Sequence, residues 1–376
     1  MAKLTFQHPV FRHAPAVTFG RGSLRSLARG HTTDTVYLTS ASDSVRAYVS
    51  DTLARDSIEL TEENWLTKPT GEPTADALRF GAAFLAAHSP RRVVAIGGGS
   101  VLDWARLVWA HASGALNLDS GKFDADAANS RVSFCLVPTT SGTGAEAADV
   151  VVYSADDGSK RSLVSPVFLA DQVVLDGRFL DGMSPVVLAG FVSDALSHAV
   201  ESYLSVVPGG LAKVSAVQAL NLLSANFRES PTHSQQDRLM EGSFLGGIAA
   251  ANCSVGIVHA FAHSVGQDKV PHGLANAVGL DRGIVFNAET RQMASLLEAL
   301  NLPDADALRQ RIGKVSNVAL AAVNDYAALG RLNQSDYRTH IAERMAADVT
   351  IRSNPRRPDG DELERFVDDI AARLPA

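Results

Sequence analysis

The arrangement of apolar runs along the chain is the feature that most limits its fold. In the first half, short apolar runs typical of buried strands, such as 35–40 and 91–99, alternate with helical segments. Strands that alternate with helices predict a mainly parallel sheet with both faces covered. From about Ser184 onward, strand-like runs disappear and only segments with helical periodicity follow. We therefore predict an α/β domain over residues 1–182 and an all-helical domain over residues 183–376.

The composition is that of a large globular protein. The 376 residues are 46% hydrophobic, which is enough apolar material for the cores of two domains. The net charge is −7 and there is no basic tract, so we expect no nucleic acid partner. The N-terminus lacks the apolar core of a signal peptide, and Cys135 and Cys253 lie in apolar runs as core thiols would. Together with abundant arginine and alanine, this predicts a protein of the bacterial cytoplasm.

One uncharged stretch, residues 244–267, requires a separate explanation. It contains no aspartate, glutamate, lysine or arginine, so by length alone it could cross a bilayer. It also holds two histidines, an asparagine and four glycines, and no other segment of the chain is similar to it. We therefore predict buried helices near a functional site, and we expect no membrane partner.

Two turns rich in small residues follow predicted strands. The sequence GGGS (97–100) ends one strand and opens a helix, where backbone N–H groups and the helix N-terminus suit an anion. Alone, it could equally be a flexible glycine turn, and it lacks the GxGxxG pattern of the usual dinucleotide fold. The sequence PTTSGTG (138–144) follows another strand and offers hydroxyls and exposed amides. Two such turns at successive strand ends favour a nucleotide, because open α/β sheets bind ligands there.

Asp194 and His198 are the first candidates for a metal site. They are four residues apart in the apolar segment 191–204, so on a helix they share one face. A buried aspartate is costly unless it is paired or bound to a metal. A hydrogen bond between the two side chains inside the core is the alternative explanation.

Three further histidines lie in or beside the uncharged stretch. His259 and His263 repeat the spacing of four, and His272 follows within 14 positions of His259, which packing alone does not explain. Together with Asp194, two or three of these imidazoles could hold a divalent first-row ion with an open position. Carboxylate and imidazole suit Fe(II) or Zn(II). The spacing decides neither between the two metals nor between His259 and His263.

Taken together, these motifs resemble those of the iron-containing (group III) alcohol dehydrogenases. The resemblance covers residues 17–290 and rests on ordered motifs, namely VTFGRGSLRSL (17–27), GGGSVLDWAR (97–106), PTTSGTGAEA (138–147), SKRSLVSP (159–166), SDALSHAVESYLS (193–205) and GIVHAFAHSVGQDKVPHGLANAVGL (256–280). It implies the fold of this family, which dehydroquinate-synthase-like proteins share: an α/β nucleotide-binding domain followed by an all-helical metal-binding domain.

The resemblance also implies a role for individual residues. It implies that Fe(II), or alternatively Zn(II), is bound by Asp194, His198, His259 and His272. His263 then corresponds to a catalytic histidine near the nicotinamide. The cofactor, NADP(H) or NAD(H), is expected to contact Ser40, Gly97, Gly98, Gly99, Ser100, Asp103, Thr139, Thr140, Thr143 and Lys160. Among these, Asp103 is also expected to take part in catalysis.

Three positions depart from the family pattern. The loop from His263 to His272 is one residue shorter than we expect, which could change the approach of His272. Ser40 follows its strand where many NAD-using members carry an aspartate, which would bind the ribose hydroxyls and repel a 2′-phosphate. Arg106 stands at the usual lysine. The last two differences leave room for NADP.

The chemistry implied is hydride transfer between the nicotinamide and a small alcohol or aldehyde whose oxygen binds the metal. We expect a homodimer. Three related activities stay open: a phosphonoacetaldehyde-reductase-like enzyme, a dehydrogenase that tailors peptides or other natural products, and a zinc enzyme similar to glycerol dehydrogenase. A nucleotide- or metal-binding protein without turnover is the alternative from another class. The complete set of one aspartate and three histidines argues against it.

Overall fold

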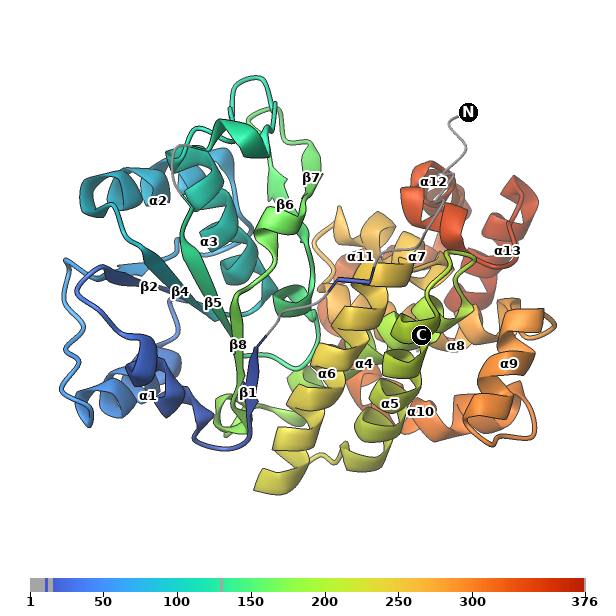
Figure 1. The fold of residues 1–376 in the computed structure, drawn as a ribbon. Coiled ribbons are helices and arrows are strands. Elements are labelled where there is room, and N and C mark those ends of the chain that lie inside the picture. Colours follow the sequence, from blue (N-terminus) through green and yellow to red (C-terminus); the bar gives the residue numbers. More distant parts are fainter. Residues whose placement is uncertain (1–10, 13–15, 129–130, 375–376) are drawn as a thin grey trace. The chain divides into compact units, whose positions relative to one another are not determined.

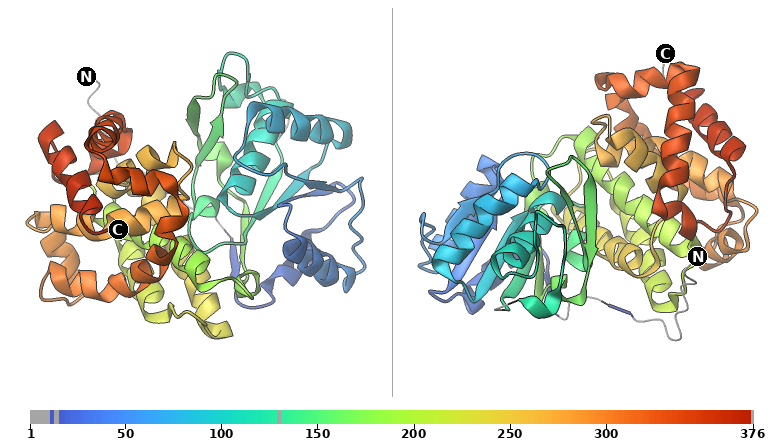
Figure 2. Two further views of the ribbon diagram at one scale, coloured as in Figure 1. Left: turned by 180° about the vertical axis from the view of Figure 1, so that it is seen from behind. Right: turned by 90° about the horizontal axis from the view of Figure 1, so that it is seen from above.

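The computed structural model describes all residues except 1–10, 13–15, 129–130 and 375–376. The chain divides into two compact units, one formed by residues 12–181 and one that begins at Gly182. The first unit combines a sheet with helices, whereas the second is helical (Figures 1 and 2).

The first unit contains a six-stranded sheet with the order β1-β8-β5-β4-β2-β3, in which all neighbours are parallel. Its strands are β1 (Val17–Phe19), β2 (Thr35–Thr39), β3 (Trp65–Thr67), β4 (Arg92–Gly97), β5 (Ser133–Pro138) and β8 (Gln172–Leu175). The central strands are buried along nearly their whole length, which explains their continuous apolar sequences. A separate antiparallel hairpin consists of β6 (Val150–Ser154) and β7 (Lys160–Val164).

Helices cover both faces of this sheet (Figure 1). One face packs against α1 (Asp43–Ala54) and the 3-10 helix η1 (Ser23–Gly30), in a core that includes Tyr37, Val94 and Ile96. The other face is covered by α2 (Ala75–His88) and α3 (Gly99–Ala112), which pack against each other. Short 3-10 helices complete the unit: η2 (Ala125–Ala127), η3 (Ala145–Ala147), η4 (Pro166–Phe168) and η5 (Gly177–Leu180).

The strand order reverses between β2 and β4. From β2 the chain continues outward to β3, and after α2 it returns to β4 on the other side of β2 and continues to β5. Open α/β sheets bind ligands at such a reversal, outside the carboxyl ends of the strands. Ser40 follows β2 at this edge and Gly97 ends β4, and the Ser40 amide donates to the Ile96 carbonyl at 3.1 Å.

The second unit consists of helices in its described part. They are α4 (Pro185–Leu204), α5 (Gly210–Asn226), α6 (His233–Cys253), α7 (Ile257–Gly266), α8 (His272–Phe286), α9 (Arg291–Ala299), α10 (Ala305–Ala319), α11 (Ala327–Gly330), α12 (Ser335–Ala347) and α13 (Gly360–Ala371), with 3-10 helices η6 (Leu320–Asp325), η7 (Arg331–Asn333) and η8 (Val349–Ser353). The centre of the unit is α4, which contacts α5, α6, α8 and α10. From Val192 to its end α4 is buried all round, as its apolar sequence predicts.

The uncharged stretch 244–267 forms the end of α6 and all of α7. The two helices meet at an angle of 100°, and the break includes Ser254, whose φ is 65°. Most of their apolar side chains in this stretch are buried, as predicted. Within the described residues, no single helix is long and apolar enough to span a membrane; only this bent pair meets the length and composition required.

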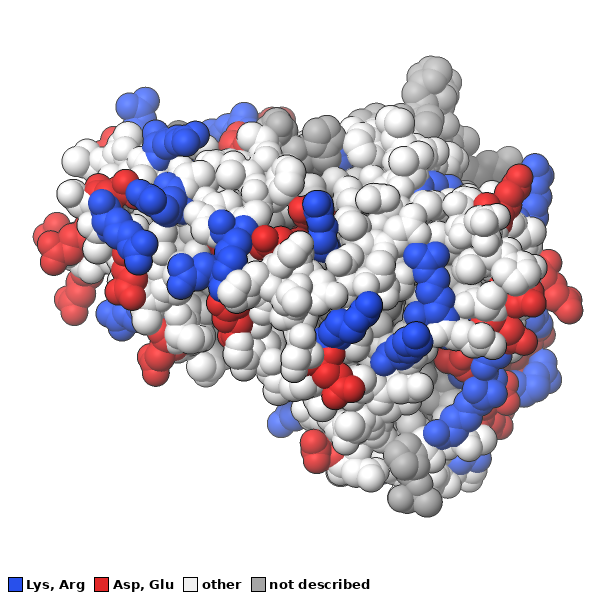
Figure 3. Space-filling model, turned by 90° about the horizontal axis from the view of Figure 1, so that it is seen from below, with Lys and Arg blue, Asp and Glu red and all other residues white. Residues whose placement is uncertain are grey.

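Several charged side chains on the surface form ion pairs. Arg79 lies within 3.5 Å of three aspartates, and Asp281 receives Arg282, Arg309 and Arg373. On the face drawn in Figure 3, basic and acidic side chains are accordingly interspersed. Exposed pairs of this kind contribute about 0.2–1 kcal/mol each. The fold is therefore held mainly by its buried apolar cores.

Candidate active site

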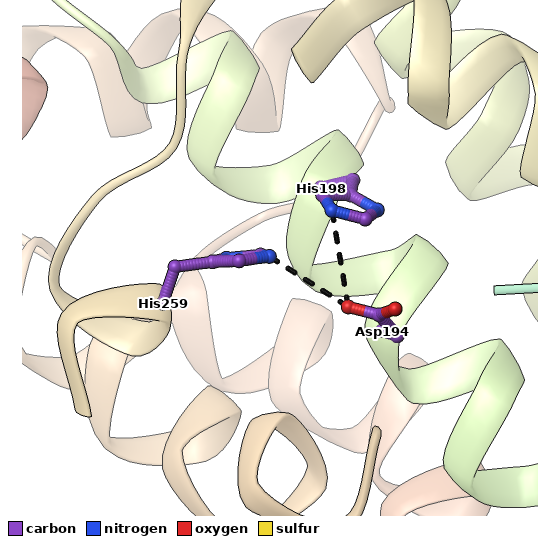
Figure 4. A group of neighbouring side chains, drawn as sticks. All are labelled: Asp194, His198 and His259. Carbon is purple, nitrogen blue, oxygen red and sulfur yellow. Dashed lines mark ion pairs between the residues drawn. The ribbon is translucent and has the colours of Figure 1, made fainter. Parts of the chain in front are cut away.

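Two helices of the second unit bring three predicted metal ligands together. Asp194 and His198 lie on one face of α4, and His259 lies on α7 (Figure 4). One donor atom from each of the three lies within 4.8 Å of the other two. Their exposed fractions are 2%, 9% and 2%, so an aspartate and two imidazoles share a largely dry interior.

The distances in this cluster suit a metal ion better than hydrogen bonds. Asp194 Oδ1 lies 3.8 Å from His198 Nε2 and 3.6 Å from His259 Nε2. Neighbouring ligands around a tetrahedral ion are about 3.4 Å apart when each bond is about 2.1 Å, whereas a hydrogen bond is shorter. Within the described chain, His259 Nε2 is buried without a hydrogen-bond partner. The donor set and its spacing therefore fit a divalent ion.

His272 approaches the same carboxylate from α8. Its Nε2 lies 3.3 Å from Asp194 Oδ1. Its side chain is 39% exposed, and it does not belong to the group of three residues whose donor atoms all lie within 4.8 Å of one another. The shortened loop before it thus leaves His272 within reach of the cluster. One turn later, Asn276 donates from Nδ2 to Asp194 Oδ1 at 2.8 Å and fixes that carboxylate.

Glu201 is a buried member of this site that the sequence interpretation did not single out. Its Oε2 lies 2.6 Å from His259 Nδ1, and its carboxylate accepts hydrogen bonds from the backbone amides of Val258 and His259. The spacing could have revealed it, because Glu201 lies seven residues after Asp194 and three after His198. All three therefore lie on one face of α4.

His263 lies beside the cluster but has a different partner. Its Nδ1 lies 2.9 Å from Asp348 Oδ2, and its ring stacks on that of His272 with centroids 5.5 Å apart. The side chain is 43% exposed, in contrast to His259. Asp348 also accepts from Thr350, which fixes its carboxylate. The pairing with Asp348 could not be predicted, since the two residues are 85 positions apart.

Burial and charge have opposite effects on the pKa values in the cluster. Burial would raise the pKa of Asp194, but the facing imidazoles hold it well below its ordinary value. Burial lowers the pKa of His198 to about 4. Burial also acts to lower the pKa of His259, yet the carboxylates of Asp194 and Glu201 raise it to about 9. Asp194 is therefore an anion that can compensate a cation.

The two predicted turns of the first unit lie against each other. A Cβ added at Gly99 would lie 2.8 Å from Thr143 Oγ1, and one at Gly98 would lie 3.5 Å from Thr140 Cγ2. The Thr139 amide donates to the Gly97 carbonyl at 3.0 Å. The absence of side chains at these glycines is thus what lets the turns approach.

The start of α3 is left open for an anion. Its N-cap is Gly98, and no described side chain caps its first amides. Such amides carry partial positive charge and suit a phosphate. Ser100 Oγ donates to the Gly71 carbonyl, and buried Lys68 donates to the carbonyls of Pro69 and Gly71. The loop after β3 is therefore fixed beside the glycine turn.

Asp103 and Arg106 have partners that change their expected roles. Asp103 accepts hydrogen bonds from Arg106 on Oδ1 at 2.6 Å and from the Val152 amide on Oδ2 at 3.1 Å. Both oxygens therefore connect segments of the first unit. Arg106 is 0% exposed and also donates to the carbonyls of Ala148 and Phe168. Because the charge of Arg106 is paired inside the unit, this residue gives no support for either NADP or NAD. Exposed Lys160 pairs with Glu72 at 2.8 Å.

Comparison with known proteins places this architecture in a family. Residues 14–177 match the family model of iron-containing alcohol dehydrogenases, and residues 189–370 match the C-terminal family of the Fe-containing alcohol dehydrogenases. A 1-propanol dehydrogenase of Salmonella typhimurium is 28% identical over 334 residues, covering 80% of this chain and 83% of that protein. An NADPH-dependent butanol dehydrogenase of Clostridium saccharobutylicum is 26% identical over 318 residues, covering 79% of this chain and 81% of that protein.

Solved structures agree with the predicted fold class. An iron-containing alcohol dehydrogenase of Thermococcus thioreducens superposes with a TM-score of 0.82 at 23% identity, covering 97% of this chain and 100% of that chain.

Since the two family models match most of the sequence, the chain belongs to the iron-containing alcohol dehydrogenase family. It is an NAD(P)-linked oxidoreductase that acts on CH–OH groups. These relatives favour none of the alternative activities considered from the sequence.

Proposed function

We propose that the protein interconverts small primary alcohols and aldehydes, using NADP(H) and a divalent metal bound by Asp194, His198, His259 and His272. The observation that carries this proposal is the buried carboxylate of Asp194, with three imidazole nitrogens 3.3–3.8 Å from one oxygen. Fe(II) is the proposed ion, with Zn(II) as the alternative, because one carboxylate and three imidazoles suit both. The names of the propanol and butanol dehydrogenases among the relatives support a small alcohol as substrate.

Each unit has a distinct part in this proposal. When bound, the metal supplies a Lewis acid for the substrate oxygen, and the nicotinamide supplies or accepts the hydride. The first unit binds the cofactor pyrophosphate with the amides of Gly98, Gly99 and Ser100. Thr139, Thr140 and Thr143 line the cofactor from the second turn. The second unit holds the metal and orients the substrate.

His263 is the proposed proton-transfer group. With Nδ1 donating to Asp348, the neutral imidazole keeps a lone pair on Nε2. Its half-exposed position suits exchange of a proton between the substrate oxygen and water. Asp103 has no proton-transfer part in this proposal, because both of its oxygens have partners within the first unit.

The preference for NADP(H) rests on Ser40. This residue follows β2 at the reversal of strand order, its Oγ is buried without a hydrogen-bond partner among the described residues, and it carries no charge to repel a 2′-phosphate. We expect kcat/KM for NADPH to equal or exceed that for NADH. We also expect Ser40→Asp to lower the ratio of kcat/KM for NADPH to kcat/KM for NADH by about tenfold or more. A repulsion of ~1.4 kcal/mol between the new carboxylate and the 2′-phosphate suffices for this change. A strong preference of the natural enzyme for NADH, unaltered by Ser40→Asp, would contradict this.

The working location and assembly are also proposals. The two cysteines of the chain are free and buried, which suits a reducing compartment such as the bacterial cytoplasm. The homodimer stays a prediction from the sequence.

A reconstitution assay tests the proposed function. Protein stripped of metal with a chelator is mixed with NADPH or NADH and a panel of short aldehydes, and the absorbance of the reduced cofactor is followed. We expect little turnover until Fe(II) or Zn(II) is added, and substantial turnover of at least one aldehyde afterwards. Full activity of the metal-free protein, or no turnover with any aldehyde, metal and cofactor, would refute the proposal.

A further inference from the structure

We infer that Glu201 is a positioning residue for the metal, because it fixes the tautomer and the ring orientation of His259. This inference rests on the proposed metal site. It concerns a carboxylate that contacts Nδ1 of His259, whereas Nε2 of that ring lies near Asp194. The contact joins Glu201 on α4 to His259 on α7, with 2.6 Å between Oε2 and Nδ1.

The surroundings of Glu201 hold its carboxylate in place. It is only 3% exposed, and its two oxygens accept from the Val258 amide at 2.6 Å and from the His259 amide at 3.3 Å. These amides belong to the first turn of α7, whose N-cap Gly256 provides no side chain. The two hydrogen bonds therefore fix both carboxylate oxygens at the start of α7, where a helix N-terminus offers free amides.

The contact with Glu201 determines which nitrogen of His259 carries hydrogen. Because Glu201 can only accept, Nδ1 must donate to it, and in the neutral ring the lone pair is then on Nε2. Nε2 is the atom that lies 3.6 Å from Asp194 Oδ1. Nε2 is therefore the nitrogen that His259 offers to a metal. A carboxylate that accepts a hydrogen bond from the second ring nitrogen of a ligating histidine also makes that histidine a more basic ligand.

His198, the other ligand candidate with a buried ring, lacks this support. His198 Nδ1 is buried without a hydrogen-bond partner among the described residues, so no carboxylate fixes its tautomer from that side. Gly256 shows how closely Glu201 is enclosed: a Cβ there would lie 3.0 Å from Glu201 Oε1 and 2.7 Å from Asn354 Oδ1. Glu201 thus has little freedom to leave His259.

The test is the Zn(II) affinity of metal-free protein, measured by competition with a chromophoric chelator. In Glu201→Gln, the amide oxygen can still accept from the helix, but the amide nitrogen would face Nδ1 and favour hydrogen on Nε2. We expect Zn(II) affinity to fall about 10–100-fold, the usual cost of losing such a partner. Glu146→Gln, which changes another buried glutamate far along the chain, is the matched control and should keep natural affinity.

Thermal unfolding of the metal-free variants separates positioning from folding. If Glu201→Gln does not fold, Glu201→Asp decides, because it keeps the charge but withdraws the carboxylate from Nδ1. We expect Glu201→Asp to fold and to bind Zn(II) about tenfold more weakly. Natural Zn(II) affinity in a folded Glu201 variant, while Asp194→Ala has lost Zn(II), would overturn the inference and leave the metal site intact. No Zn(II) binding by the unmodified protein would instead refute the proposed function, and the inference with it.

Discussion

Asp194 shows what spacing in a sequence can and cannot predict. Its pairing with His198 follows from a separation of four residues on a helix, and the structure places both in one buried cluster. The same spacing occurs in His259 and His263, so spacing alone could not distinguish them. What differs is the tertiary partner: His259 Nδ1 faces Glu201, whereas His263 Nδ1 faces Asp348. Those partners are 58 and 85 positions away, beyond the reach of any local pattern.

Alanine variants of the two histidines should therefore fail in different ways. We predict that His259→Ala loses the metal, because a ligand is removed. We predict that His263→Ala keeps the metal but loses about 10²–10⁴-fold in turnover, the usual contribution of a proton-transfer group. Metal analysis beside kinetics on both variants checks this. A metal-free His263→Ala, or a His259→Ala with full metal, would reverse the assignment.

Because Glu146 is buried, we predict that the free energy of unfolding of the first unit depends on pH. It is 1% exposed, its Oε2 has no hydrogen-bond partner among the described residues, and burial raises its pKa from 4.5 to about 7. The folded state therefore binds a proton that the unfolded state releases, so the free energy of unfolding falls as pH rises from about 4.5 to 7. The loss is roughly 3 kcal/mol at most.

Glu146→Gln removes this titration. We expect the variant to be more stable than the natural protein at pH 8 and similar to it at pH 4.5, as measured by urea unfolding of the metal-free proteins. Identical pH profiles for the two proteins would show that Glu146 does not titrate in this range.

At the scale of elements, long periodic segments were predictable and short ones were not. The long helices α4 and α5 occur where the sequence after Ser184 shows helical periodicity, as predicted. The three-residue strand β3 and the β6–β7 hairpin were missed. Short edge strands carry little periodicity, and their pairing depends on neighbours elsewhere in the chain. The break between α6 and α7 includes Ser254, a non-glycine residue with positive φ.

The close packing of α8 on α4 should be sensitive to a single methyl group. A Cβ at Gly273 would lie 2.4 Å from the Gly190 carbonyl oxygen, so Gly273→Ala must push α8 away from α4. We expect a loss of about 1–3 kcal/mol in stability, as for other overpacked sites. We also expect weaker metal binding, since the adjacent His272 would move from Asp194.

Gly313→Ala is the matched control for that variant. Gly313 lies within α10, and a Cβ there would meet nothing within 4 Å. This change should be neutral or stabilise by up to about 1 kcal/mol. Equal unfolding midpoints for Gly273→Ala and the natural protein would show that the contact tolerates a side chain.

At the scale of the whole molecule, the change from alternating strands and helices to helices alone predicted the fold class that the related structures confirm. The two turns rich in small residues, 97–100 and 138–144, could be predicted because glycine and hydroxyl residues directly follow strands. Their mutual contact through Gly99 and Thr143, and the burial of Arg106, depend on how α3 packs and required the structure. Substrate choice depends on loop side chains whose positions local sequence does not determine.

The central claim is that Asp194 and the histidines around it hold a catalytic metal. Metal analysis of protein produced with iron tests it most directly, on the natural chain and on Asp194→Ala and His272→Ala. We predict about one divalent ion per chain in the natural protein and a large loss in both variants, because each lacks one of four ligands. Metal content that is the same in all three proteins would contradict the account.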